Sequence, residues 1–509
     1  MADLLSVHAG LQPDKPALVE GERVVSWAQR NERANRAANV LSALGVKAGD
    51  RVAMMAFNSI AGFELSGGLG KLEAIGVPVN FRLRDAELAY IVNDSGASVV
   101  CAGPEFVEHV QAARASVRGD VVFAVLGGAP PPPGWLSFDD LLAAASPEQP
   151  PSEESGGLGA TMIYTSGTTG HPKGAYRPHG VPLEHVMNSI QMFGLSGDDV
   201  HLMAGPGYHS AVAFFSALTT AVGGTIVIMR RFDAEAALAL IDRHRVTTTF
   251  MAPTLLHRIM DLPEEVRRRY DVSSMRAVIL GAAPCPFSLK ERATAYFGET
   301  LYEFYGATET GVNLLLRPED QLRKPGSAGR PAEGQEVLLL DDQGNPVPDG
   351  VPGELWARSD WLATYYKRPD ATARAMRDGF FSVGDVAYRD GDGFYYICDR
   401  KIDMIISAGV NIYPAEVEAC LHGHPAVADV AVIGVPDDQW GEAVKAVVAL
   451  LPGAEPGELE LIDWCRGRIA DYKRPRSIDF VPELPRDLAG KLLKRQIREP
   501  YWAGTGRRI

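Results

Sequence analysis

The sequence has few cysteines, no long apolar run and no secretion signal. Its five cysteines are spread over 509 residues, and no two of them form a C-x-x-C pair. Neither a disulfide framework nor a zinc site is therefore indicated, and unpaired thiols are typical of a reducing compartment. No run of about 20 apolar residues occurs, as a transmembrane helix would require. The N-terminus lacks the basic segment of a signal peptide, so we expect a cytoplasmic protein with no integral membrane segment.

Positive charge is also in deficit. The chain has 50 lysines and arginines against 64 aspartates and glutamates, a net charge of −14 at pH 7. A protein that binds nucleic acid or an anionic membrane would show the opposite excess, so we expect no nucleic-acid partner. A small anionic ligand is not excluded, because a pocket can be positive on an acidic protein. With 46% hydrophobic and 22% charged residues, the composition is that of a globular protein of two to four structural units.

Helix and strand patterns alternate along the first part of the chain. Ser26 and Gln29 fit the capping box of a helix that stops near Gly45, and a strand is predicted at 51–56. The proline-rich stretch at 127–135 can only be an extended surface connection. The N-terminal region is therefore expected to be built from α/β layers.

Two later apolar runs end in small residues. Residues 276–284 and 301–309 each place four to six apolar residues before a glycine, which predicts strands buried on both faces. Ligands of such sheets bind beyond the carboxyl ends of the strands. From about residue 330 the turn residues fall at hairpin spacing, which indicates a β-rich subdomain.

The region after Arg400 is predicted to be a separate small unit. It contains strands, one clear helix over 414–421 and a basic terminal helix. The expected fold is therefore a large N-terminal multi-layer α/β domain, 1–400, with a β-rich subdomain, and a small mobile α+β domain, 401–509. The hinge is expected at 400–403.

The stretch at 161–174 reads T-M-I-Y-T-S-G-T-T-G-H-P-K-G, a strand that enters a loop of hydroxyls and glycines. The spacing is not that of a P-loop, because only two residues separate Gly167 from Gly170 and Lys173 is followed by glycine. Hydroxyls, converging backbone N–H groups and one lysine can nevertheless hold polyphosphate. A flexible Ser/Thr/Gly turn is the alternative interpretation.

Several motifs appear in an order that resembles one protein family. The loop at 164–174 resembles the signature loop of the adenylate-forming superfamily, which includes the acyl-CoA synthetases. Further segments resemble other motifs of that family in its own order: G-A-A-P at 281–284, Y-G-A-T-E at 305–309, V-G-D at 383–385, D-R-K-I-D-M-I-I-S-A-G-V-N-I-Y-P-A-E-V-E at 399–418 and L-A-G-K at 488–491.

The resemblance implies a nucleotide site. The residues expected to bind ATP and AMP are Thr165, Ser166, Gly167, Thr168, Thr169, Gly170, Lys173, Gly281, Ala282, Ala283, Pro284, Tyr305, Gly306, Ala307, Asp385 and Arg400. Tyr305 would stack on adenine, and Asp385 would accept from both ribose hydroxyls with Arg400 near the same ribose. Thr308 would donate to the α-phosphate. Glu309, with Thr165, would hold Mg²⁺.

Catalysis is expected to involve a lysine from the small domain. Lys491 would reach the α-phosphate and stabilise the charge that accumulates as a carboxylate attacks phosphorus. Ile402 occupies a hinge position where the family usually has a polar residue, so which side chain fixes the hinge stays open.

The remaining expectations concern CoA and the acid. Gly409 resembles the glycine beside which pantetheine passes, and Lys473 and Arg474 are candidates for the CoA phosphates, with solvated surface as the alternative. His209 resembles a gate between the ATP and acyl sites, and a packed core histidine is the alternative. The expected acyl pocket consists of Ala211, Val212, Phe214 and Val312. Because Ala211 is small, we expect an apolar acid, aromatic or medium- to long-chain.

The resemblance therefore implies an acyl-CoA synthetase that uses ATP, Mg²⁺ and CoA, forms an acyl adenylate and releases AMP and pyrophosphate. Homodimers are usual among such proteins. The alternatives are a stand-alone enzyme that loads a separate carrier protein, a luciferase-like oxidation, for which the sequence offers little support, and a non-catalytic ATP-binding regulator.

Overall fold

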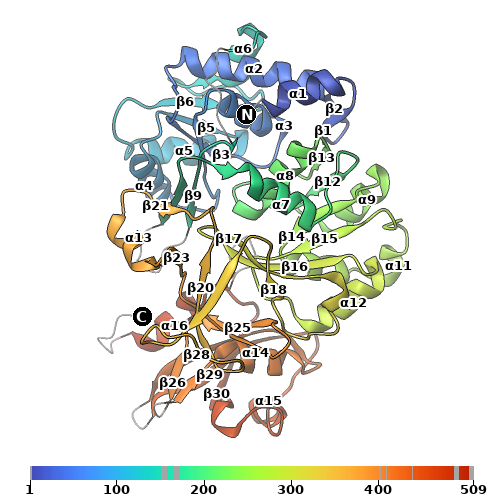
Figure 1. Cartoon of the computed structure of the whole chain (residues 1–509), viewed down its shortest axis with the longest axis vertical. Helices are drawn as coiled ribbons and strands as arrows, with labels where there is room; N and C mark the ends of the chain where they lie inside the picture. Colours follow the sequence, from blue (N-terminus) through green and yellow to red (C-terminus); the bar gives the residue numbers. More distant parts are fainter. Residues whose placement is uncertain are drawn as a thin grey trace.

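A computed structural model describes residues 3–150, 157–165, 172–400, 403–407, 410–437, 440–486 and 492–503 of the chain, with the backbone alone at 157, 158, 399, 400, 410 and 411. The molecule is elongated, with the N-terminal layers at one end and the C-terminal strands and helices at the other (Figure 1). The expected fold class is confirmed: a large α/β region is followed by a small C-terminal domain.

A nine-stranded sheet forms the centre of the large region. Its order is β18-β17-β16-β15-β14-β12-β13-β1-β2. The strands are β1 (Pro16–Glu20), β2 (Arg23–Ser26), β12 (Val200–Met203), β13 (Thr225–Ile228), β14 (Thr248–Met251), β15 (Ala277–Leu280), β16 (Leu301–Ala307), β17 (Gly311–Leu316) and β18 (Arg330–Pro331). Both apolar runs form strands, β15 and β16, which pair in parallel. The prediction of burial on both faces is confirmed for β15 and is wrong for β16, in which only Leu301 and Glu303 are fully buried.

Helices accompany this sheet; those from α8 to α12 lie in the connections between its parallel strands, which must cross over its faces, and α1 and α7 precede β1 and β12. They are α1 (Leu4–Leu11), α7 (Leu183–Met192), α8 (Ser210–Val222), α9 (Ala234–His244), α10 (Pro253–Met260), α11 (Glu264–Arg267) and α12 (Phe287–Phe297). One core cluster packs α8 against the strands through Phe215, Leu218, Phe250 and Ile279.

A second, five-stranded sheet is formed by strands that lie between β2 and β12 in the sequence, in the order β4-β3-β5-β6-β7. Its elements are β3 (Arg51–Met55), β4 (Ile75–Pro78), β5 (Val99–Ala102), β6 (Val122–Val125), β7 (Leu136–Ser137), α2 (Trp27–Ala43), α3 (Ile60–Lys71), α4 (Asp85–Ser95), α5 (Val107–Arg114) and α6 (Phe138–Ala144). The expected capping box of α2 is formed by Ser26 and Gln29. The strand expected at 51–56 is β3, and 127–135 is a connection between β6 and β7.

Two small ribbons join the layers. The strands β9 (Thr161–Thr165), β10 (Lys173–Arg177) and β21 (Thr364–Tyr365) form a three-stranded sheet, and β8 (Gly157–Leu158) pairs with β11 (Val181–Pro182). The expected phosphate loop is the connection between β9 and β10. Its residues 166–171 lie outside the described part of the chain.

The expected β-rich subdomain is a six-stranded sheet. Its elements are β19 (Glu336–Leu340), β20 (Gly353–Arg358), β22 (Met376–Arg377), β23 (Phe380–Phe381), β24 (Asp385–Arg389), β25 (Tyr395–Arg400) and the helix α13 (Pro369–Ala375). β24 and β25 form the hairpin that the sequence Y-R-D-G-D-G-F-Y-Y predicts, and Asp390 accepts from the backbone N–H groups of Asp392 and Phe394 at its turn.

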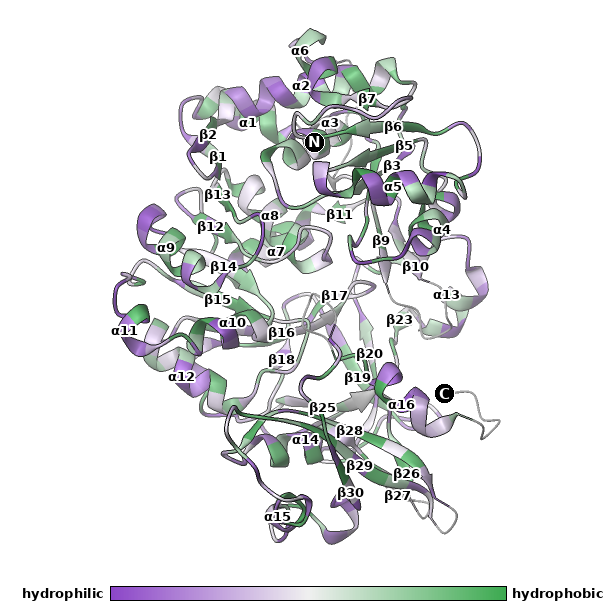
Figure 2. Ribbon diagram, turned by 180° about the vertical axis from the view of Figure 1, so that it is seen from behind, coloured by the Kyte–Doolittle hydropathy of each residue, from purple (hydrophilic) through white to green (hydrophobic). Residues whose placement is uncertain are grey.

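The C-terminal domain has its own sheet and core. It contains β26 (Ile405–Ser407), β27 (Val410–Ile412), β28 (Val427–Asp437), β29 (Gly441–Leu450), β30 (Ser477–Phe480), α14 (Pro414–His422), α15 (Glu458–Trp464) and α16 (Lys494–Trp502). The helix predicted at 414–421 is α14. Figure 2 shows hydrophobic residues concentrated in β28 and β29 and hydrophilic ones on outer helices such as α12. No helix in the described ranges is long and apolar enough to cross a membrane.

Candidate active site

The expected nucleotide-binding segments meet at the carboxyl ends of β15 and β16. Gly281–Pro284 follows β15 directly, and Tyr305, Gly306 and Ala307 form the end of β16. Parallel strands present their carboxyl ends at one edge of the sheet, so these two segments are neighbours there. The two segments expected to bind the nucleotide therefore lie side by side at this edge of the sheet, where the sequence predicts the ligand site.

Two glycines at this edge are required by close packing. A Cβ at Gly306 would lie 1.9 Å from the carbonyl oxygen of Gly311 on the paired strand β17. A Cβ at Gly281 would lie 2.8 Å from the ring of Phe304. Both positions bring backbone closer to a neighbour than any side chain allows.

Ala282 has a left-handed backbone, with φ of 70°. For a residue with a Cβ this conformation costs ~1–2 kcal/mol. Such strained residues cluster at ligand sites, where the surrounding structure holds them in place. Ala282 lies within the segment that is expected to contact adenine.

Tyr305 and Asp385 are in direct contact. The Tyr305 hydroxyl donates to Asp385 Oδ2 at 2.5 Å, which connects β16 of the central sheet to the first residue of β24 in the β-rich sheet. Asp385 and Arg400 are paired across the β24–β25 hairpin, so the three residues converge as expected. The Arg400 side chain lies outside the described part.

Glu309 is buried immediately after β16 and is 7% exposed. Its Oε1 accepts from the Thr165 hydroxyl at 3.3 Å and from the Tyr365 hydroxyl at 3.0 Å. The expected metal pair, Glu309 and Thr165, is thus brought together across 144 positions.

The donor set around Glu309 fits Mg²⁺. In the described ranges no group of three or more His, Cys, Asp or Glu side chains could hold a metal ion by itself. Mg²⁺ bound with nucleotides typically takes one or two carboxylates and completes its shell with phosphate oxygens and water. A single buried carboxylate beside a phosphate loop meets that requirement.

Thr308 is held from two sides. Its hydroxyl lies 3.0 Å from the Ser210 hydroxyl at the start of α8, and its carbonyl accepts from the Arg177 guanidinium at 2.5 Å. His209 is the N-terminal capping residue of α8, and its ring lies 4.5 Å from that of Tyr208. The expected gate histidine therefore stands one residue from a side chain that contacts Thr308.

Arg177 was absent from the sequence-based expectation. It is buried, its Nε donates to the Trp361 carbonyl at 3.0 Å, and its guanidinium lies 4.4 Å from the centre of the Trp361 ring. Burial lowers the pKa of Arg177 to about 10, against the opposing effect of the Glu309 carboxylate, so it remains a cation at neutral pH. Strand periodicity places Arg177 on the same face of β10 as Lys173, a signal that the sequence did contain.

The expected acyl residues gather in one cluster. Val212 and Val312 are buried in the central core, and Ala211 and Phe214 are partly buried against it. Phe214 stacks on Trp361 with ring centres 5.3 Å apart. A Cβ at Gly311 would lie 2.6 Å from the same indole. Trp361 is therefore a wall of this cluster that no sequence motif indicated.

The ends of the expected phosphate loop are anchored by α4 of the second sheet. The Tyr164 hydroxyl donates to Asp94 Oδ2 at 2.8 Å, and the Tyr90 hydroxyl donates to the Pro172 carbonyl at 3.3 Å. Arg368, which follows β21, donates to both Asp94 and Tyr90 at 3.1 Å. Of the loop itself, Ser166, Gly167, Thr168, Thr169 and Gly170 lie outside the described residues.

The expected CoA residues are engaged within the small domain. The Lys473 ammonium contacts both carboxylate oxygens of Glu416, at 2.6 and 2.8 Å, and Arg474 pairs with Asp471 at 3.1 Å. Two positions further along, the exposed Arg476 places its guanidinium 4.9 Å from the Trp440 ring centre. Gly409 and Lys491 lie outside the described residues.

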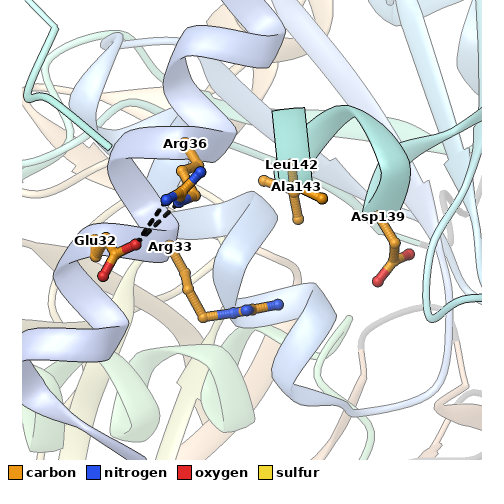
Figure 3. A pocket seen from close by; sticks show the side chains of 6 residues that line it. All are labelled: Glu32, Arg33, Arg36, Asp139, Leu142 and Ala143. Atoms are coloured by element: carbon orange, nitrogen blue, oxygen red, sulfur yellow. Dashed lines mark hydrogen bonds and ion pairs between the residues drawn. The ribbon is translucent and has the colours of Figure 1, made fainter. Parts of the chain in front are cut away.

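A surface pocket of about 320 Å³ lies away from these residues, between α2 and α6 (Figure 3). It is lined by Glu32, Arg33, Arg36, Asp139, Leu142 and Ala143. Arg36 pairs with Glu32 at 2.9 Å, and Arg33 pairs with the buried carboxylate of Glu64. We assign no ligand to this pocket, because carboxylates of Glu32 and Asp139 line it beside the arginines and it lies apart from the expected nucleotide residues.

Known proteins resemble the chain over nearly its whole length. Residues 5–367 match the family of AMP-binding enzymes, and residues 416–491 match the AMP-binding enzyme C-terminal domain. A feruloyl-CoA synthase of Amycolatopsis sp. is 38% identical, with 97% of both chains covered. The long-chain-fatty-acid–CoA ligase FadD13 of Mycobacterium tuberculosis is 37% identical, with 98% of both chains covered. The ATP-bound structure of MatB from Rhodopseudomonas palustris aligns with a TM-score of 0.88 at 30% identity, with 99% of both chains covered.

Proposed function

The chain belongs to the AMP-binding enzyme family, in its acyl-CoA ligase branch, and we propose that it converts an aromatic or fatty acid into its CoA thioester. In the first step a carboxylate oxygen attacks the α-phosphorus of ATP, and pyrophosphate leaves. In the second step the CoA thiolate attacks the carbonyl carbon of the acyl adenylate, and AMP leaves. The enzyme is an acid–thiol ligase with ATP and CoA as its co-substrates.

The contact between Glu309 and Thr165 is the observation that carries this proposal. It joins the end of the central sheet to the start of the phosphate loop. Mg²⁺ would be held there by Glu309 and would neutralise charge on the phosphates. Lys173 and the loop hydroxyls would hold the β- and γ-phosphates, and Thr308 would donate to the α-phosphate.

The nucleoside is assigned to the space between two sheets. Adenine would lie between Tyr305 and the strained segment at 281–284, with Gly306 and Ala307 beneath it. Asp385 would accept from the ribose hydroxyls, with Arg400 beside them. The contact of Tyr305 with Asp385 supports this assignment, because it fixes the ring and the carboxylate in one arrangement.

The acid is assigned to the cluster around α8. Ala211, Val212, Phe214 and Val312 offer an apolar environment beside Thr308, with His209 between the acid and the phosphates. The aromatic and long-chain acids in the names of the relatives support an apolar acid.

The second step is assigned to the small domain. We propose that residues 401–509 rotate about a hinge at 400–403, so that Lys491 serves adenylation and the segment with Gly409 serves the thiol. CoA phosphates would meet Lys473 and Arg474. The exposed Arg476 extends that basic stretch beside Trp440. Assembly as a homodimer and a cytoplasmic location belong to the same proposal.

A panel of carboxylic acids with ATP, Mg²⁺ and CoA tests the function, with AMP, pyrophosphate and the acyl-CoA measured. We expect acid-dependent release of pyrophosphate and AMP, and a thioester product from apolar acids. Trapping of the adenylate by hydroxylamine without CoA consumption would instead indicate an enzyme that loads a carrier protein. Absence of acid-dependent pyrophosphate release would contradict ligase activity and favour an ATP-binding regulator.

A further inference from the structure

Tyr365 touches two charged residues of the proposed phosphate site at once. Its hydroxyl donates to Glu309 Oε1 at 3.0 Å. The Lys173 ammonium lies 5.0 Å from the centre of its ring, within the range of a cation–π interaction. One aromatic side chain therefore stands between the carboxylate expected to bind metal and the lysine expected to bind phosphate.

The backbone around Tyr365 fixes it in this position. Tyr365 pairs with Ala175 across the β10–β21 ladder, two residues beyond Lys173. The Ala363 N–H donates to the Glu309 carbonyl at 2.8 Å, and the Tyr366 N–H donates to the Gly174 carbonyl at 2.9 Å. The strand that carries Tyr365 is therefore bonded both to the turn with Glu309 and to the strand with Lys173.

Both hydroxyl contacts of the Glu309 carboxylate are made by the same oxygen. Oε1 accepts from two hydroxyls, those of Tyr365 and Thr165. A carboxylate oriented by two donors on one oxygen directs its other oxygen, Oε2, to a separate partner. Both donors are neutral hydroxyl groups, so neither of them forms an ion pair with the carboxylate.

The ring also keeps Lys173 from competing for that carboxylate. Among the described residues, Lys173 and Glu309 do not form an ion pair within 4.0 Å. A direct pair would neutralise both groups before substrate arrives. With its ammonium over the aromatic face and no carboxylate partner in the part of the chain that the structure describes, Lys173 stays available to phosphate.

We propose that Tyr365 is a positioning residue that orients Glu309 toward Mg²⁺ and separates it from Lys173. The proposal rests on the proposed function for the identity of the metal and the nucleotide. According to this proposal, the affinity for Mg²⁺ depends on Tyr365, a residue that belongs neither to the phosphate loop nor to the Y-G-A-T-E segment. Tyr365 acts through Glu309 and Lys173.

The test measures ATP binding by calorimetry with Mg²⁺ and with EDTA, in the full chain. The variant Tyr365→Phe keeps the ring over Lys173 and removes only the hydroxyl. We expect the gain in ATP affinity from Mg²⁺ to fall about three- to tenfold, while ATP binding in EDTA stays within twofold of the parent. Tyr366→Phe is the matched control, since that neighbouring ring packs against Tyr176 instead, and it should behave as the parent.

Two further variants test the contributions of the Tyr365 ring and of the two hydroxyl donors separately. Tyr365→Leu also removes the ring, so Lys173 can reach Glu309, and ATP affinity should then fall in EDTA as well. Combining Tyr365→Phe with Thr165→Val removes both donors to Oε1, and the combined effect on the Mg²⁺ dependence should exceed the product of the two single effects. Equal loss of affinity with and without Mg²⁺ in Tyr365→Phe, or no difference from Tyr366→Phe, would overturn the proposal. ATP binding and ligase activity are measured independently. The binding data can therefore contradict the positioning role of Tyr365 while the ligase assay supports the proposed function, and the ligase assay can fail while the binding data support the positioning role.

Discussion

The Tyr305 hydroxyl lies 2.5 Å from Asp385 Oδ2, and the two residues are 80 positions apart in the sequence. Tyr305 lies near the end of a strand of the central sheet, and Asp385 begins a strand of the β-rich sheet. A short hydrogen bond to a carboxylate fixes both the plane of the ring and the direction of the second carboxylate oxygen. The proposed nucleoside site is therefore set by the contact between two sheets.

Replacing Asp385 tests this arrangement. Asp385→Ala removes the proposed ribose acceptor and the partner of Tyr305, so the KM for ATP should rise about 10- to 100-fold, with a smaller effect on the KM for the acid. Tyr305→Phe loses only the hydroxyl and should raise the KM for ATP less. Steady-state kinetics with each substrate varied in turn would check this. An unchanged KM for ATP in Asp385→Ala would contradict the assignment.

Replacing Lys491 separates the two chemical steps. Lys491→Ala should slow pyrophosphate release about 10²–10³-fold, because an oriented cation at the α-phosphate is lost. Thioester formation from a preformed acyl adenylate and CoA should keep most of its rate, since the lysine is proposed to leave the site before that step. Single-turnover assays of each half-reaction would measure both rates. Equal loss in both would argue against a rotating small domain.

The size of residue 211 should set the size of the acid. Ala211→Trp should lower kcat/KM for bulky aromatic or long-chain acids by at least about tenfold, with less effect on short acids, because it fills space beside Phe214. The acid panel would be repeated with this variant. A uniform decrease over all chain lengths would exclude Ala211 from the acyl pocket.

Gly306 should not tolerate a side chain. In Gly306→Ala the added Cβ would meet the Gly311 carbonyl oxygen at 1.9 Å, so we expect a loss of stability above about 3 kcal/mol and loss of ATP binding. The control is Gly70→Ala in α3, where an added Cβ has no neighbour within 4 Å and should stabilise the chain by about 0.5–1 kcal/mol. Thermal unfolding would compare the Tm values. A parental Tm for Gly306→Ala would show that the β16–β17 hairpin can open there.

His201 should make stability depend on pH. It lies buried on β12, with Nδ1 3.0 Å from the Thr248 hydroxyl, and burial lowers its pKa to about 4, against the opposing effect of Asp199. The unfolded chain, with a pKa near 6.5, binds a proton between pH 6.5 and 4 that the folded chain does not. Stability should therefore fall as the pH is lowered through this window, by up to about 3 kcal/mol, and remain unaffected by this group above it.

The variant His201→Asn lacks the titrating ring and should lose this part of the pH dependence. Its Tm at pH 7.5 will be lower than that of the parent, but the further decrease to pH 5 should be smaller. Thermal unfolding of both proteins at several pH values measures the difference. Parallel curves for the two proteins would assign the acid sensitivity to other groups.

Local sequence patterns predicted helices and strands, whereas the contacts of several site residues depend on partners far apart in the sequence. The capping box of Ser26 and Gln29 involves neighbours, and the fully buried strand β15 needs only its own apolar run, so both could be predicted from the sequence. Arg177 contacts Thr308 across 131 positions, and Tyr365 contacts Glu309 across 56. Nothing near Tyr365 in the sequence distinguishes it from Tyr366, because only the pairing of β21 with β10 decides which ring faces the site.

The anchoring of the phosphate loop by α4 has a consequence for protein engineering. Asp94 and Tyr90 of α4 bond to Tyr164 and Pro172, which lie within 161–177, and to Arg368, which lies within 361–368. A chimaera that exchanges the N-terminal 150 residues with those of a relative would split this set of partners between two parents. Recombination sites are therefore best chosen so that 85–95, 161–177 and 361–368 come from one parent, even though they are not contiguous.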